Sequence, residues 1–310
     1  MKKNIINIML LLLPLGVLGQ TDIQMSQHML NRTTYNPAST GASRYVNIYG
    51  QWRDQWQGFG SDRPKTIFLT AHAYFNEFKS GLGIIALKDN IGFERNMLFK
   101  TAYAYHVNLS SNSYLSLGLN GGVLNRYIDW TDARAQDPTS PAIPTEPENK
   151  WTADFDFGME YNMERFTAGL SLTHLNHTAD KATFGDMGHH FYGYLKYKFS
   201  LNFDFDIVPA FFAQNSKKST HLELSTLAYY RNKTWIGVSY RADEKFESES
   251  VVGIIGLDLN NTFRLSYSFD YNIGKLKTND APFRNTHEVM LGIRLSRPQH
   301  VYAKSPRFFE

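Results

Sequence analysis

The sequence predicts an all-β protein: a transmembrane antiparallel up-and-down β-barrel of about 14 strands, with a short N-terminal periplasmic segment. Three observations support this prediction. The chain begins like an exported protein, its aromatic content is 15% although its mean hydropathy is only −0.38, and its apolar residues recur at every second position. Strands that are apolar on one face and polar on the other combine these properties, so we expect the barrel to lie in an outer membrane with membrane lipids around it.

The first residues have the pattern of a secretory signal peptide. Lys2 and Lys3 form a positive n-region, an apolar run follows, and a cut is expected before Gln20. A transmembrane anchor is the alternative, but the apolar run is short and Pro14 interrupts it. No later segment is long and apolar enough for a membrane helix. We therefore expect residues 1–19 to be a signal peptide.

The composition excludes several classes of function. The chain contains no cysteine, which excludes lipoprotein attachment, disulfides and thiolate metal sites. Without the two leader lysines, 30 Lys and Arg residues stand against 29 Asp and Glu residues. A chain that is almost neutral argues against nucleic-acid binding, so no nucleic-acid partner is expected.

Alternation with a period of two defines the strands. In residues 263–272, Phe and Tyr residues and one Leu alternate with Arg, Ser, Asp and Asn residues, and a strand places each set on its own face. A soluble antiparallel fold is the alternative, because alternation does not say what the apolar face meets. The same pattern predicts strands at residues 43–56, 65–75, 80–89, 95–109, 113–128, 151–161, 165–175, 190–200, 202–214, 221–230, 234–242, 250–259, 262–272 and 286–296.

The connections between these strands tend to alternate between long and short. Long ones are expected at FGSDRP, KDNIGFER, residues 129–150, LNHTADKATFGDMGHH and residues 274–285; short ones are expected at NEFK, SSNS, NME, RNK and NN. Short turns on one side and long loops on the other are typical of bacterial outer-membrane barrels, in which the short turns are periplasmic. We therefore divide the chain into a periplasmic or plug-like segment (20–42), the barrel (43–296) and a periplasmic C-terminal tail (297–310), with both termini in the periplasm.

The inner face of the predicted barrel carries charges of both signs, which can pair across the lumen. A barrel of about 14 strands is wide enough for a narrow pore unless something fills it. The segment ahead of the first strand is a candidate to lie at the periplasmic mouth or to enter the lumen, with Asn36-Pro37 as a rigid turn. We hypothesise that Tyr35 to Gly41 packs at the mouth against the first strand; the alternative is a turn that only launches that strand. The lumenal charges are Lys100, His106, Asp154, Asp156, Glu160, Lys196, Lys198, Asp204, Asp206, Glu223, Arg264, Asp270, Glu288 and Arg294.

The sequence contains no recognisable catalytic grouping, and neither a cofactor nor a metal is expected. A His pair spaced i, i+3 at a strand end should not aim both rings at one point, so solvated loop histidines are favoured over a metal site. The histidines concerned are His174, His177, His189 and His190. Mid-strand glycines more often mark a bend, a bulge or a close approach than a phosphate loop; these are Gly118, Gly121 and Gly122. We expect no enzymatic activity.

Three spaced elements resemble the PorP/SprF family of outer-membrane proteins of Bacteroidota. The first is a "YNPA.G"-like element, matched by Tyr35, Asn36, Pro37, Ala38 and Gly41. The second is an "R.QW.G" strand end, matched by Arg53, Gln55, Trp56 and Gly58, and the third is a "P.T" element, matched by Pro64 and Thr66. Ser39-Thr40 departs slightly from the commoner residues at those positions.

The resemblance implies a role in the type IX secretion and gliding-motility machinery. Members are outer-membrane barrels, and some accompany a secreted adhesin and its type B C-terminal domain, while others lie near periplasmic ring proteins of the core apparatus. We expect protein partners of these kinds, bound above all through residues 129–150, a loop too long to be a mere turn. The alternative function is a transport channel for small solutes or lipids.

Overall fold

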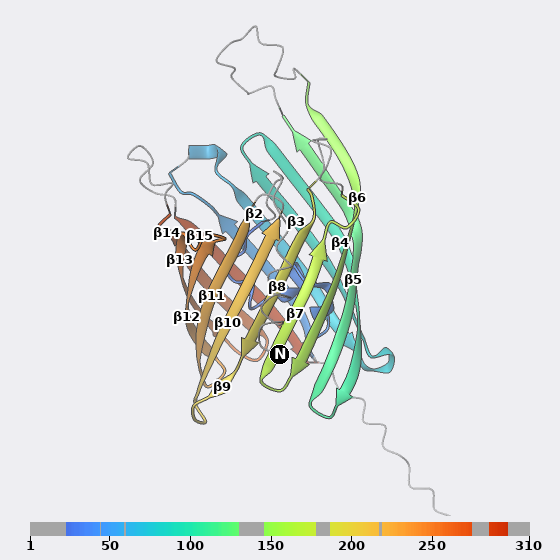
Figure 1. Ribbon diagram of the computed structural model, residues 1–310, viewed down its shortest axis with the longest axis vertical. Coiled ribbons are helices and arrows are strands. Elements are labelled where there is room, and N and C mark those ends of the chain that lie inside the picture. Colours follow the sequence, from blue (N-terminus) through green and yellow to red (C-terminus); the bar gives the residue numbers. More distant parts are fainter. Residues whose placement is uncertain are drawn as a thin grey trace, which may run out of the picture.

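The strands of the protein close into an antiparallel barrel. The computed structural model describes residues 23–43, 45–58, 60–129, 146–177, 187–216, 219–274 and 285–296. The predicted signal peptide, most of the 129–150 loop and the predicted C-terminal tail lie outside these residues. Within them, each strand pairs with its neighbours in sequence order, and β1 pairs with β15 to close the ring (Figure 1).

The strands are β1 (Tyr45–Asp54), β2 (Lys65–Phe75), β3 (Ser80–Ile91), β4 (Glu94–Ser110), β5 (Ser113–Ile128), β6 (Glu148–Met163), β7 (Phe166–Thr173), β8 (His190–Tyr197), β9 (Phe199–Ser200), β10 (Phe205–Ser216), β11 (Thr220–Tyr230), β12 (Thr234–Asp243), β13 (Ser248–Asp258), β14 (Phe263–Asn272) and β15 (Thr286–Ser296). Because β8 and β9 are consecutive and both pair with β10, they form two pieces of one wall strand. The result is a closed 14-strand barrel, which confirms the predicted fold class.

Several strand boundaries differ from the prediction by one to three residues, and local hydrogen bonds explain one of these differences. Strand β10 begins at Phe205 rather than at residue 202. The Asn202 side chain accepts hydrogen bonds from the backbone N–H groups of Asp204 and Phe205 at 2.9 Å, which fixes a turn before the strand. The connection expected at KDNIGFER is short, because β3 and β4 extend to a tight turn in which Gly92 has a φ of 57°.

The two ends of the barrel differ. At one end, which we call the hairpin end, tight turns join β4 to β5 and β6 to β7. At the opposite end, which we call the long-loop end, the longer connections join β1 to β2, β5 to β6, β7 to β8 and β14 to β15. No helix among the described residues is long and apolar enough to cross a bilayer.

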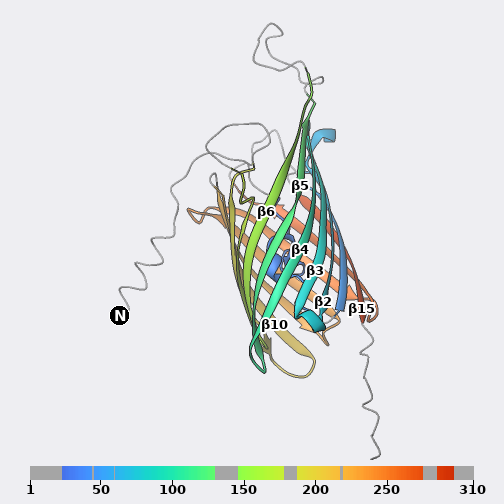
Figure 2. The same cartoon turned by 90° about the vertical axis from the view of Figure 1, so that its right-hand side faces the viewer.

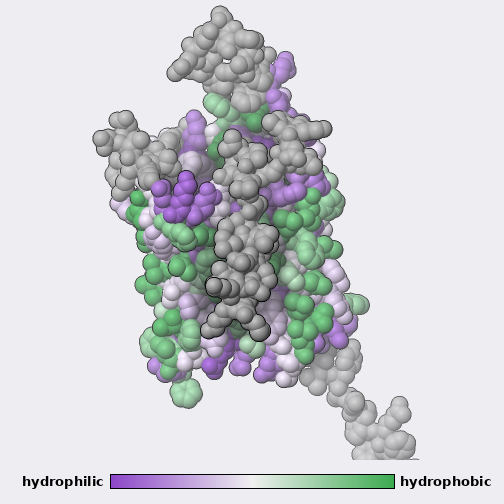
Figure 3. Space-filling view, viewed as in Figure 1, coloured by the Kyte–Doolittle hydropathy of each residue, from purple (hydrophilic) through white to green (hydrophobic). Residues whose placement is uncertain are grey.

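Apolar side chains face outward along the wall. In β2, Ile67 and Leu69 are 55% and 44% exposed, whereas Thr66 and Thr70 are fully buried inside the barrel. Hydrophobic residues accordingly cover much of the visible side of the molecule, with hydrophilic residues gathered toward its ends (Figure 3). This is the surface that a transmembrane barrel presents to lipid.

The lumen is less uniformly polar than the alternation suggests. Met25 packs against Phe68, Ile85 and Ala102 in one buried apolar cluster. Met29 belongs to a second cluster, formed with Leu227, Trp235, Val252 and Ile254. Both methionines belong to the chain ahead of β1, so these inward apolar residues have a partner inside the barrel.

Candidate functional site: the N-terminal segment in the lumen

Residues 23–43, which we call the lumenal segment, run through the interior of the barrel. The Met25 carbonyl accepts a hydrogen bond from Arg241 near the long-loop end of β12 (3.1 Å). The Ala42 carbonyl accepts one from the Tyr114 hydroxyl near the hairpin end of β5 (3.2 Å). The segment therefore descends from the long-loop half to the hairpin end before β1 starts at Tyr45, and Figure 2 shows it within the ring of strands. Its contacts reach far beyond the first strand, against which the sequence hypothesis packed it.

An ion pair between Arg53 and Glu288 holds the part of the lumenal segment that lies in the long-loop half. The Glu288 carboxylate on β15 accepts hydrogen bonds from the backbone N–H groups of Ser26 (2.8 Å) and Gln27 (3.0 Å). Arg53 on β1 donates to the same carboxylate (3.1 Å) and to the Ser26 hydroxyl (2.6 Å). A buried ion pair is favourable only when its remaining hydrogen-bonding groups are satisfied, and here the segment satisfies them.

A second charged group lies on the neighbouring wall. Glu223 on β11 contacts His28 of the lumenal segment at 3.1 Å and accepts a hydrogen bond from Arg241 on β12 at 2.7 Å. Arg241 also donates to Asp270 on β14 at 2.7 Å. Two carboxylates predicted for the lumen, Glu223 and Asp270, thus share Arg241, which was not among the predicted lumenal charges, and Glu223 has a further partner in the segment itself.

Arg32 forms the central anchor. Its Nε and Nη2 atoms donate to the two carboxylate oxygens of Glu160 on β6, at 2.7 and 3.3 Å. Glu160 is fully buried and also accepts hydrogen bonds from Asn162 and from the Tyr194 hydroxyl. Such a two-point guanidinium–carboxylate contact fixes both position and orientation.

The ring of Tyr35 is enclosed by aromatic side chains. Its centroid lies 5.1 Å from that of Phe212 and 5.4 Å from that of Tyr194, both in edge-to-face geometry, and 5.7 Å from that of Tyr192. The Tyr35 hydroxyl donates to the carbonyl of His28. Aromatic pairs at these distances add to the free energy of burial.

The Asn36 to Gly41 part of the lumenal segment lies on a row of small residues that crosses the wall. The row is formed by successive register partners on five adjacent strands: Gly81, Ala104, Gly118, Gly158 and Ser171. A Cβ atom at Gly118 would lie 2.2 Å from the backbone nitrogen of Ala38, and one at Gly81 would lie 2.0 Å from the carbonyl oxygen of Thr40. The wall is hollowed here by the absence of side chains, and the segment's backbone fills the hollow.

The Asn36 side chain joins this part of the segment to three strands. Its Oδ1 accepts from the backbone N–H of Ala38 (2.9 Å) and caps the short 3₁₀ helix Pro37–Ser39, which is the rigid turn predicted for Asn36-Pro37. Its Nδ2 lies within donor distance of the Met159 carbonyl, the Leu170 carbonyl and the Tyr194 hydroxyl. One amide therefore fixes the local turn and its place on the wall together.

Gly41 ends the contact with the row. Its φ of 75° lies in the left-handed region that favours glycine, and an added Cβ would lie 2.6 Å from the Cα of Gly81. The Gly41 N–H donates to Nδ1 of His72 on β2 (3.1 Å), and the chain continues from there to the hairpin end.

The remaining predicted residues lie around the connection from β1 to β2. The Gln55 N–H donates to the Pro64 carbonyl (2.9 Å), which closes the base of that connection, and Thr66 donates to Asp89 (2.6 Å). Gly58 has a φ of 121°. Beside them, hydrogen bonds to Asp54 raise the pKa of the partly buried Arg63 guanidinium.

A cavity of about 490 Å³ occupies the long-loop half of the lumen. Gln55, Trp56 and Pro64 line one side of it, and Ile23 and Gln24 of the lumenal segment also border it. The three motif elements therefore lie around the lumenal segment. Residues of the first element lie on the small-residue row, and residues of the other two lie at the Arg53–Glu288 pair and along the cavity.

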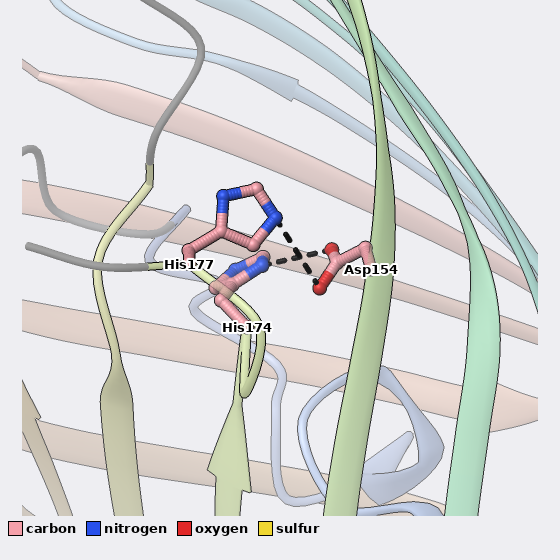
Figure 4. Close-up of side chains that lie close together, drawn as sticks. All are labelled: Asp154, His174 and His177. Atoms are coloured by element: carbon pink, nitrogen blue, oxygen red, sulfur yellow. Dashed lines mark hydrogen bonds and ion pairs between the residues drawn. The ribbon is translucent and has the colours of Figure 1, made fainter. Parts of the chain in front are cut away.

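The expectation that His174 and His177 do not aim at one point is wrong. His174 has a left-handed φ of 59°, and the His177 N–H donates to its carbonyl (3.0 Å), so the chain turns back on itself. Both rings consequently face Asp154 on β6, and the ligand atoms of the three residues lie within 4.8 Å of one another (Figure 4). A regular strand would have separated the two rings; the turn does not.

The sequence did not single out Gly81 or Gly158 and gave Gly118 only a general reading. All three were visible as glycines inside predicted strands, and the register of adjacent strands is what makes them one row. Pairing the predicted strands in order and looking for small residues on one inward line would have revealed it.

Comparisons with known proteins agree with this architecture. The family model for the type IX secretion system membrane protein PorP/SprF matches residues 17–293. No curated protein sequence matches the chain.

Solved structures share the fold at low sequence identity. The Ralstonia pickettii toluene transporter TbuX has a TM-score of 0.54 at 10% identity, over 91% of this chain and 96% of that one. The CymD monoaromatic hydrocarbon channel has a TM-score of 0.51 at 12% identity, and the Pseudomonas putida toluene transporter TodX one of 0.50 at 10% identity, each over 91% of this chain and 96% of the other. At this identity the likeness shows a shared barrel fold.

Proposed function

Because the chain belongs to the type IX secretion system membrane protein family PorP/SprF, we propose that it is a non-enzymatic outer-membrane component of the secretion and gliding-motility machinery. In this proposal it assists the export or surface anchoring of a secreted adhesin by binding protein partners. The type B C-terminal domain of the adhesin meets the long-loop end, outside the cell. Periplasmic ring proteins meet the hairpin end, at which β15 ends and β1 begins.

The observation that carries the proposal is the filled lumen. The lumenal segment is bonded to β1 and β15 through Arg53 and Glu288, to β6 through Glu160, and packs directly on the small-residue row. A polypeptide or solute has no straight path through such a barrel. The ends of the barrel, rather than its interior, are therefore the surfaces on which partners are expected to act.

Exposed apolar residues at the hairpin end support a partner there. Phe78, Phe203 and Leu259 lie in three different turns and are 67%, 107% and 64% exposed. Exposed apolar residues mark a protein or membrane contact where they gather into one patch, so these turns are the positions at which we place the partner.

Site-specific photo-crosslinking in the native host tests the proposal. A photoreactive residue in place of Phe203 should capture a periplasmic ring component, and one in place of Gln57, at the long-loop end, should capture an adhesin C-terminal domain. The matched control replaces Leu69, whose exposed side chain faces outward nearer the middle of β2, and it should capture neither. Equal capture at all three positions, or none at either end, would contradict the assignment.

The alternative, a channel for small solutes or lipids, is favoured by one observation: the cavity in the long-loop half. The names of TbuX, TodX and CymD describe transport of small hydrocarbons by those proteins. Conductance of the purified chain in a planar bilayer separates the two functions, because steady open current in the unmodified protein requires a lumen that the segment does not close.

A further inference from the structure

We propose that Asp154, His174 and His177 form a binding site for a divalent transition metal, with Zn²⁺ as the ion that the donor set suits best. Two imidazoles and one carboxylate are ligands that zinc accepts in tetrahedral sites that keep a position open. The three side chains are buried, and their ligand atoms lie within 4.8 Å of one another. Ligands around a tetrahedral zinc lie roughly 3.3 Å apart, so only a small inward shift is needed.

The turn that carries the two histidines is fixed on both sides of Asp154. The Leu175 N–H donates to the Phe155 carbonyl (2.8 Å), and the Asn176 side chain donates to the Ala153 carbonyl (2.5 Å) and accepts from the Phe155 N–H (3.2 Å). These bonds clamp the turn onto β6 on either side of the carboxylate. The imidazoles are thus held in position before any ion arrives, as a metal site requires.

The charge balance of this corner of the lumen calls for another cation. Lys100 donates to both oxygens of Asp156 at 2.8 Å, and Asn120 and the His174 N–H complete the partners of that carboxylate. Lys100 also lies 2.9 Å from Asp154, so one ammonium stands against two carboxylates. Among the described residues, the other charged or ionisable partners of Asp154 are His174 and His177, and neutral imidazoles leave a negative charge there that a metal ion would compensate.

The present contacts of both imidazoles would change when the metal binds. His174 Nδ1 is hydrogen-bonded to Asp154 at 2.8 Å, and His177 Nε2 lies 3.9 Å from the same carboxylate (Figure 4). The metal would enter between these atoms, and Lys100 would keep its two bonds to Asp156. Coordination through His177 Nε2 would place the ring proton on Nδ1 and end the 3.3 Å hydrogen bond that Nδ1 accepts from the Met187 N–H. His174 lines the 490 Å³ cavity, which gives an ion a route to the site.

Metal content and binding of the full-length chain in detergent, purified without a histidine tag and stripped with a chelator, test the proposal. Zn²⁺ should bind at about one ion per chain, and Co²⁺ should give the visible absorption of a tetrahedral site. His177→Gln and Asp154→Asn should weaken Zn²⁺ binding at least about tenfold. The matched control is His221→Gln, which removes a histidine that contacts the carboxylate of Glu249 at 2.9 Å but belongs to no such cluster within the described part of the chain.

Heat-modifiable migration in gel electrophoresis confirms that each variant is a folded barrel. If Asp154→Asn does not fold, His177→Gln alone decides the result. Failure of the unmodified chain to bind more Zn²⁺ than His177→Gln, or an equal loss in His221→Gln, would overturn the site. Neither result depends on secretion, so the proposed function is tested separately.

Discussion

Replacing Gly118 with valine should drive the lumenal segment off the small-residue row. The Cβ of any larger residue would meet the backbone nitrogen of Ala38 at 2.2 Å and the carbonyl carbon of Pro37 at 2.3 Å. Both are backbone atoms of a capped turn, so no flexible side chain can yield. The segment must move as a unit.

The expected cost follows from these contacts. Overpacking a filled interior costs about 1–3 kcal/mol. Displacing the turn also removes the hydrogen bonds of Asn36 to the wall and that of Ser171 to the Tyr35 carbonyl, each worth about 1 kcal/mol. A docking free energy lowered by about 3 kcal/mol raises the population of the displaced state roughly 150-fold.

Thiol labelling measures this displacement directly, because the chain contains no cysteine. A Ser39→Cys reporter is buried in the docked segment and should react with a maleimide slowly in the parent and much faster with Gly118→Val. The matched control is Gly253→Val on β13, where an added Cβ meets nothing within 4 Å. If both valine variants are folded and label at the same rate, the small-residue row does not hold the segment and the reasoning is refuted.

Three further predictions concern the anchors. Arg32→Ala leaves the buried carboxylate of Glu160 without its cation, so it should destabilise the barrel by about 3–5 kcal/mol, measured as thermal unfolding by gel migration. The control Arg231→Ala removes an exposed ion pair and should cost under about 1 kcal/mol. Arg53→Gln should lower the unfolding temperature and increase the thiol-labelling rate of a reporter near the start of the segment, but not that of the Ser39→Cys reporter. An equal increase in labelling rate at both sites would contradict separate anchors. A double-mutant cycle of Gly158→Ala with Asn36→Ser should show a coupling of about 1 kcal/mol or more, because the added methyl group would meet the asparagine Oδ1 at 2.1 Å; additive effects would argue against that contact.

The strands of the barrel wall can be predicted well from the sequence because their side chains alternate between two faces. A strand places successive side chains on opposite faces, so the alternation in residues 263–272 identifies β14 without any knowledge of its neighbours. The errors arise where a local bond overrides the pattern. Asn202 delays the start of one predicted strand by accepting hydrogen bonds from the backbone that follows it. The left-handed φ of His174 turns a chain that the periodicity treats as straight.

The interior could be predicted only in part, because its contacts join residues far apart in the chain. Arg53 and Glu288 are separated by most of the sequence and meet only because β1 closes the ring with β15. The sequence places Glu288 on an inward face and Arg53 in a family-like motif, but it does not say that Ser26 bonds to both. Inward apolar residues such as Phe68 and Ile85 were also hard to interpret, since their partner Met25 precedes the barrel.

The two halves of the lumen close by different physical means. In the long-loop half, the segment is held by ion pairs such as Arg53–Glu288, and a cavity of about 490 Å³ remains beside it. In the hairpin half, Gly81 and Gly118 let backbone meet backbone with no space for even a methyl group. Ion pairs fix where the segment lies, but they do not fill the cross-section. The tightest contact between the segment and the wall therefore lies at the small-residue row, whereas the cavity, which His174 borders, lies in the long-loop half of the lumen.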